Sequence, residues 1–128
     1  MDRIDHIHVF VADRAAAERW YQGVLGLKRV TALEVWAEDP NGPLIMANSG
    51  HTVCLSLFER APEPCRTTIA LRVSGEPFLQ WQDWLSKRLP EPPRLEDHQL
   101  AWSLYFSDPD GNPFEITTYD RDIPIRRA

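Results

Sequence analysis

The chain has 128 residues, with 14 Lys and Arg against 19 Asp and Glu and a formal net charge of −5. This length allows one compact core and is short for two independent domains, so we expect a single domain over residues 1–128. The negative charge argues against nucleic acid or an anionic membrane as a partner. No apolar run approaches the ~20 residues of a membrane span, and no export signal is visible at the N-terminus. With two cysteines only, we expect reduced thiols and a cytoplasmic protein.

The first half of the chain begins with a strand predicted over residues 4–11. Asp13 can cap a helix over residues 14–25, and Gly26 is well placed to end it. The apolar side of this helix is predicted to consist of Ala16, Trp20, Tyr21, Val24 and Leu25. Turn residues then separate three strand-like runs, at residues 28–36, 43–48 and 52–58.

The second half repeats this order after a predicted linker at residues 61–64. A strand over residues 67–73 precedes Pro77, which suits the first turn of a helix over residues 77–89. The apolar side of that helix is predicted to be Phe78, Trp81, Leu85 and Leu89. Strand-like runs at residues 94–98, 102–107 and 113–119 complete the half.

The repeated order predicts an α+β fold of two tandem βαβββ modules, at about residues 1–60 and 65–120. We expect the modules to form a curved, cup-like mixed sheet with the helices on the outside. Aligning the first strands of the modules needs an offset of 62, and aligning the glycines of their last turns, Gly50 and Gly111, needs 61. Four aligned positions are then predicted to converge in the cup: His6, Cys54, Thr68 and Glu115.

Two phrases of the sequence carry a family resemblance. "DHIHVFVADRAAAERWYQGVLGL" resembles the opening strand and helix of the vicinal oxygen chelate superfamily, and "YFSDPDGNPFEI" resembles its closing turn and ligand-bearing strand. This superfamily includes glyoxalase I, fosfomycin-modifying thiol transferases, extradiol dioxygenases and bleomycin-binding proteins. The resemblance covers nearly the whole chain, and it implies the fold without selecting a reaction.

The resemblance implies a divalent metal site, because metal-dependent members ligate an ion from the four equivalent positions. His6 matches the ligand of the first strand and Glu115 the ligand of the last strand. An imidazole and a carboxylate suit Zn, Mn, Ni, Fe or Co ions, which act as Lewis acids. The chain departs from the family at Thr68, where many members carry a histidine.

Further residues can complete the predicted site. His8 points to the same side of its strand as His6, so it is a candidate ligand or a catalytic acid or base. Cys54, at the fourth position, would suit Zn²⁺ as a thiolate, or it is a small buried hydrophobe. His98 resembles a proton-handling histidine of the extradiol dioxygenases, or it is a loop residue. Tyr105 is expected near the cup.

Two hypotheses about function stay open at this point. One is a metal-dependent lyase, dioxygenase or thiol transferase that acts on a small oxygen-rich metabolite or xenobiotic. The other is a metal-free protein of the bleomycin-resistance type that binds a small molecule between aromatic walls. The threonine at position 68 favours the second, whereas the presence of His6, His8 and Glu115 together favours the first. The resemblance also implies a homodimer.

Overall fold

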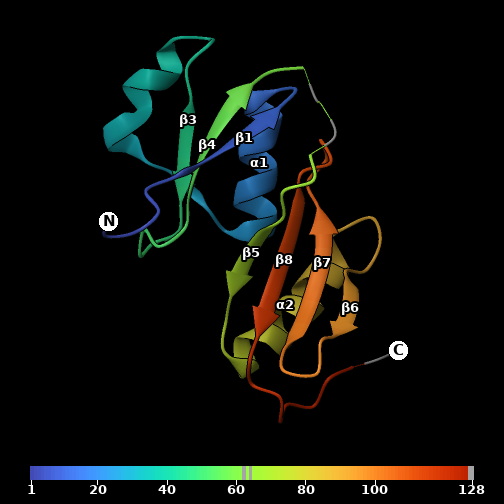
Figure 1. Cartoon of the computed structure of the whole chain (residues 1–128). Helices are drawn as coiled ribbons and strands as arrows, with labels where there is room; N and C mark the ends of the chain where they lie inside the picture. The colour runs from blue at the N-terminus through green and yellow to red at the C-terminus, as the bar shows by residue number, and fades with distance from the viewer. Residues whose placement is uncertain (62, 64, 127–128) are drawn as a thin grey trace. The chain divides into compact units, whose positions relative to one another are not determined.

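A computed structural model of the chain describes residues 1–61, 63 and 65–126, so the predicted linker at 61–64 lies partly outside the described residues. Contacts divide the chain into two compact units, Met1–Pro64 and Cys65–Ala128. Figure 1 shows a labelled α-helix and labelled strands in each unit. The fold is therefore α+β with two tandem modules, as the sequence predicted. Among the described residues, no helix combines the length and apolarity that a membrane crossing requires.

The first unit forms a four-stranded mixed sheet. Its elements are β1 (Ile7–Val11), α1 (Arg14–Leu25), β2 (Lys28–Arg29), the 3₁₀ helix η1 (Thr31–Glu38), β3 (Leu44–Ala47) and β4 (Cys54–Glu59). The strand order is β1-β4-β3-β2, in which β1 pairs with β4 in parallel and the other pairs are antiparallel.

The second unit repeats this topology. Its elements are β5 (Ile69–Arg72), α2 (Gly75–Arg88), β6 (Arg94–Asp97), β7 (Trp102–Ser107) and β8 (Pro113–Thr118). The order β5-β8-β7-β6 again has one parallel pair, β5 with β8, and antiparallel pairs elsewhere. The two halves of the chain thus have the same connectivity around sheets of the same order.

Alternation along the strands gives each sheet an apolar face and an open face, because successive side chains point to opposite sides. Most of the buried apolar strand residues of the first unit lie on one face: Val9, Val11, Leu44, Met46, Leu55 and Leu57. The corresponding face of the second unit holds Leu104, Phe106, Phe114 and Ile116. In the first unit, Ile45 and Ala47 are buried on the other face. Helix α1 packs against β2, β3 and β4, and α2 packs against β8. The side chains of the predicted site belong to the opposite, open faces.

The helices match their predictions, with differences at their ends. Asp13 caps α1 by accepting a hydrogen bond from the amide of Ala16 at 3.1 Å, and Gly26 ends the helix in the left-handed conformation. The buried residues of α1 are Ala17, Tyr21, Val24 and Leu25, so Ala17 is buried and the predicted Ala16 is exposed. Helix α2 begins at Gly75, two residues before the predicted start, because the Asp120 carboxylate accepts the Gly75 amide at 2.7 Å.

The predicted strand over residues 28–36 is wrong beyond its second residue. Pairing of β2 with β3 covers Lys28 and Arg29, and the last contact is the Val30 amide donating to the Ile45 carbonyl at 2.9 Å. The chain then turns into η1, where the Leu33 amide donates to the Val30 carbonyl at 3.0 Å. The sequence of this segment, TALEVWAE, is rich in Ala, Leu and Glu, which favour helical over extended backbone.

Candidate functional site

The predicted site residues lie in two groups, one in each unit. His6, His8 and Cys54 belong to the first unit, and the second contains Thr68, His98, Tyr105 and Glu115. The convergence of the two groups around one cup stays a prediction.

Two histidines lie side by side at the start of β1. The Nε2 atoms of His6 and His8 are 3.1 Å apart, and their rings stack with centroids 5.0 Å apart. The Asp5 carboxylate lies 2.7 Å from Nδ1 of His6, on the opposite edge of that ring. The His8 ring also contacts Phe58 of β4, with the ring centroids 4.7 Å apart. The first unit therefore presents two neighbouring imidazoles, one of them oriented by a carboxylate.

Cys54 is half-buried at the start of β4. Burial raises the pKa of its thiol, and the negative charge of Asp5 raises it further. The thiol is therefore protonated at neutral pH when no metal is bound.

Glu115 lies in β8 on the open face of the second sheet. The buried Ser103 hydroxyl donates to its Oε2 at 2.6 Å, and that hydroxyl is also 3.0 Å from the hydroxyl of Thr117. The Thr117 hydroxyl in turn donates to the Trp102 carbonyl at 3.2 Å. The Ser103 hydroxyl thus fixes one oxygen of the Glu115 carboxylate. Glu115 is therefore oriented, and it is only partly exposed.

Tyr105 connects two of the predicted residues. It pairs with Glu115 across β7 and β8, and its hydroxyl lies 2.9 Å from Nε2 of His98. The guanidinium of Arg94 lies 4.8 Å from the centre of the Tyr105 ring. Burial raises the pKa of the Tyr105 phenol, and the neighbouring charge of Glu115 raises it further. The phenol therefore stays protonated and can donate a hydrogen bond beside Glu115.

The strand registers give a second way to compare the modules. Ile7 pairs with Leu55 in the first unit, and Ile69 pairs with Phe114 in the second. If Ile69 is taken as the equivalent of Ile7, as in the sequence alignment that matches Thr68 with His6, then Phe114 is the equivalent of Leu55. In the last strands, however, this register aligns Ser56 with Glu115, whereas the sequence comparison aligned Cys54 with it.

The physical reason lies in the last hairpin of each module. The Asn48 amide donates to the Val53 carbonyl, and the Asp108 amide donates to the Asn112 carbonyl, so the first loop is one residue longer. Gly50 and Gly111 therefore do not hold the same place in the two loops. Ser56 is buried, and its hydroxyl has no hydrogen-bond partner among the described residues.

Sequence reasoning missed the residues that orient the candidate ligands. Asp5 contacts His6, Ser103 contacts Glu115, and Ser56 lies beside His8 in the register of β1 and β4. Ser103 is two residues before Tyr105, so strand alternation alone places both on one face. Within the described residues, no group of three or more His, Cys, Asp or Glu side chains is arranged to hold a metal ion.

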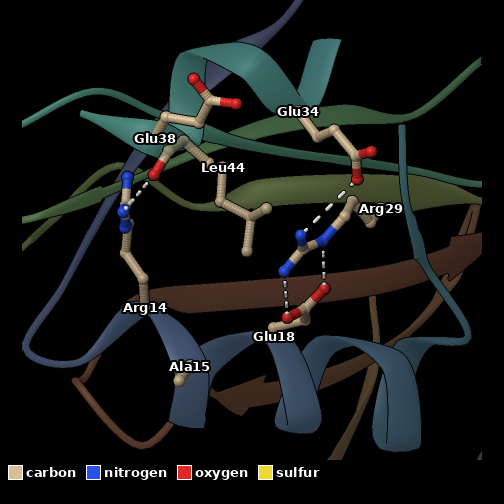
Figure 2. A pocket seen from close by; sticks show the side chains of 8 residues that line it. Arg14, Ala15, Glu18, Arg29, Glu34, Glu38 and Leu44 are labelled. Atoms are coloured by element: carbon tan, nitrogen blue, oxygen red, sulfur yellow. Dashed lines mark hydrogen bonds and ion pairs between the residues drawn. The ribbon is translucent and has the colours of Figure 1, made fainter. Parts of the chain in front are cut away.

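A cavity of about 440 Å³ lies apart from these residues, between α1 and η1 (Figure 2). Glu18 receives two hydrogen bonds of 2.8 Å from Arg29, which also lies 3.6 Å from Glu34. Arg14 donates to the backbone carbonyls of Ala37, at 2.8 Å, and of Gly42. Both arginines are thus bonded to the walls of the cavity and hold η1 against α1. The cavity contains none of the predicted site residues.

Comparison with known proteins adds the family. The family model of the Glyoxalase/Bleomycin resistance protein/Dioxygenase superfamily matches residues 3–116. Among curated proteins there is no significant match.

Several solved structures share the fold. A putative glyoxalase family protein from Bacillus anthracis is 20% identical with a TM-score of 0.71, over 94% of this chain and 97% of that one. The fosfomycin resistance protein FosX from Listeria monocytogenes, in complex with Mn(II) and sulfate, is 16% identical with a TM-score of 0.69, over 95% and 94%. A lactoylglutathione lyase from Agrobacterium tumefaciens is 19% identical with a TM-score of 0.69, over 92% and 94%. At these identities the likeness extends to the fold alone.

Proposed function

Because the chain belongs to the Glyoxalase/Bleomycin resistance protein/Dioxygenase superfamily, we propose that it is a divalent-metal-dependent enzyme of the glyoxalase or dioxygenase type. This membership confirms the resemblance to the vicinal oxygen chelate proteins. The proposed substrate is a small oxygen-rich metabolite or xenobiotic, and the proposed location is the cytoplasm. His6 and Glu115 would hold the ion, which could be Zn, Mn, Ni, Fe or Co.

One observation supports this proposal above the others. Each module carries one metal-suited donor that is already oriented by a hydrogen bond with a neighbouring side chain. The Asp5 carboxylate accepts a hydrogen bond from Nδ1 of His6, which leaves Nε2 of that ring for a ligand bond. The Ser103 hydroxyl donates a hydrogen bond to one oxygen of Glu115. Such outer partners fix the ring orientation and the basicity of metal ligands. The chemistry of the donors thus fits a borderline divalent ion.

The remaining site residues would handle protons. A bound ion would act as a Lewis acid that polarises oxygen atoms of the substrate. Tyr105, kept protonated, can donate a hydrogen bond or a proton at its hydroxyl, and His98 lies 2.9 Å away to exchange that proton. His8, next to His6, is placed to act as a ligand or as a base.

Metal analysis tests the proposal. Untagged protein purified without chelators is expected to contain about one divalent ion per chain, and His6→Ala and Glu115→Gln are each expected to lose it. Glu96→Gln is a matched control, because Glu96 lies in β6 of the same sheet and is paired with Arg94 at 2.8 Å. A metal-free protein that resists loading with Mn²⁺, Ni²⁺, Fe²⁺ or Zn²⁺ would contradict the proposal.

One alternative is favoured by a specific observation. Thr68 stands where a third ligand is expected, and no group of three metal-binding side chains occurs among the described residues. These facts favour a metal-free binding protein of the bleomycin-resistance type. Phe10 and Phe58, on the open face of the first sheet, would then contact the ligand. Retention of small aromatic compounds by metal-free protein, unchanged in Glu115→Gln, would support this alternative.

A further inference from the structure

We propose that His6 and His8 together chelate one divalent transition-metal ion, with His8 supplying the nitrogen ligand that position 68 lacks. This inference deepens the proposed function, on which it rests for the presence of the ion, by naming a further ligand. It assigns His8 to metal binding rather than to proton transfer.

The backbone of β1 brings the two imidazoles together. Residues two apart in a strand point to the same face, and here the two Nε2 atoms are 3.1 Å apart. Two nitrogen ligands at about 2.0–2.1 Å from an ion are about 3.0 Å apart at a right angle and about 3.4 Å apart at the tetrahedral angle. The nitrogens of His6 and His8 therefore already have the separation that two ligands of one ion require.

The hydrogen bonds of His6 determine which nitrogen is free to bind. Asp5 accepts from Nδ1 of His6 at 2.7 Å, so the lone pair of this histidine is on Nε2. Without a metal, Nε2 of His8 donates its proton to that lone pair. With its proton on Nδ1 instead, His8 would present the lone pair of Nε2 to an ion beside that of His6.

Packing restricts His8 to this position. Its ring contacts that of Phe58, and its partner in the register of β1 and β4 is Ser56. The buried Ser56 hydroxyl lacks a hydrogen-bond partner among the described residues, and such a group destabilises the fold. The first sheet therefore keeps an unsatisfied polar group beside the histidine pair. In native protein structures, buried polar groups without a hydrogen-bond partner are rare, and each is a place to test for a bound ligand.

Nitrogen ligands can be counted directly by electron paramagnetic resonance of Cu²⁺ added to the full-length protein at one equivalent. We expect superhyperfine splitting from two equivalent nitrogens in the wild type and from one in His8→Ala. His8→Gln serves as a second variant that keeps a side chain against Phe58. His51→Ala is the matched control, because His51 is an exposed turn residue outside the pair, and it should keep the wild-type pattern.

Competition titrations with Zn²⁺ complete the test, with an expected loss of affinity of about tenfold or more in both His8 variants. One nitrogen in the wild type, or two nitrogens that survive in His8→Ala, would overturn the chelate. The outcome for Glu115→Gln separates the two proposals. If Glu115→Gln abolishes binding and the His8 variants do not, the proposed function stands and the chelate fails. If the His8 variants alone lose the ion, the chelate stands and ligation by Glu115 fails.

Discussion

The ion pair between Glu18 and Arg29 links α1 to β2 and makes part of the stability depend on pH. The hydrogen bond from Arg29 holds the pKa of the Glu18 carboxyl below its ordinary value of 4.5. The unfolded chain therefore binds this proton at a higher pH than the folded chain does. The stabilisation is fully present above pH 4.5 and is lost as the pH falls through the lower folded pKa.

Glu18→Gln should consequently lower the free energy of unfolding at pH 7 by about 0.5–1 kcal/mol, since both partners are partly exposed. The difference from wild type should shrink as the pH falls below 4.5. Urea unfolding at several pH values measures this difference in the free energy of unfolding. Glu34→Gln is the control, because Glu34 lies 3.6 Å from Arg29 and is 50% exposed, so its effect should be smaller. A pH-independent difference for Glu18→Gln would contradict the explanation.

Position 68 tests the correspondence between the two modules at a single residue. The sequence alignment of the first strands of the two modules matches Thr68 with His6. A histidine there would add an imidazole ligand, so Thr68→His should raise the affinity for Zn²⁺ or Mn²⁺ by about tenfold or more. Isothermal titration of the two proteins gives the comparison. Thr67→His is the control, because residue 67 is one residue away and is expected on the other side of the chain. Equal metal affinities for the wild type, Thr68→His and Thr67→His would count against the alignment of Thr68 with His6.

At the scale of elements, the end of α1 depends on a glycine. Gly26 has a φ of +70°, and its amide donates a hydrogen bond to the Gln22 carbonyl. Residues with a side chain adopt this left-handed conformation at a cost of about 1 kcal/mol. Gly26→Ala should therefore lower the free energy of unfolding by about that amount. Gly23→Ala, inside the same helix with no atom within 4 Å of the added carbon, should raise it by about 0.5–1 kcal/mol. Thermal unfolding of both variants measures the two shifts, and shifts of the same sign would contradict this account.

The elements that the sequence predicted well are those with strong periodicity and clear ends. Helix α1 has an apolar stripe, Asp13 at its start and Gly26 at its end, and its bounds agree with the prediction. The segment of η1 has apolar and polar residues in an order that fits a strand or a helix. The position of η1 depends in addition on contacts from outside the segment, such as those of Arg14 with the carbonyls of Ala37 and Gly42. Local sequence does not contain that information.

The candidate site could be predicted by residue type but not by its supporting contacts. His6, His8 and Glu115 were found from the motifs of the family and from strand alternation. The hydrogen bonds of Asp5 and Ser103 depend on side-chain rotamers, which the sequence does not specify. The residue of the first module that corresponds to Glu115 depends on the lengths of the hairpin loops, which turn glycines alone do not specify.

At the scale of the whole molecule, we propose that two copies of the chain pair. Small members of the superfamily are expected to combine their modules in this way, as the resemblance implied. Light scattering combined with gel filtration should give twice the mass of one chain at micromolar concentration. A mass of one chain throughout a dilution series would exclude the dimer as the functional unit.

The central claim is that an imidazole of the first module and a carboxylate of the second bind the same ion. A double-mutant cycle on Zn²⁺ affinity, with His6→Ala, Glu115→Gln and the double variant, tests it most directly. If both residues bind one ion, the losses in binding free energy should be non-additive by at least about 0.5 kcal/mol. In the control cycle, which combines His6→Ala with Glu96→Gln, the losses in binding free energy should be additive. Additive losses in both cycles, or no loss in Glu115→Gln, would contradict the shared metal site.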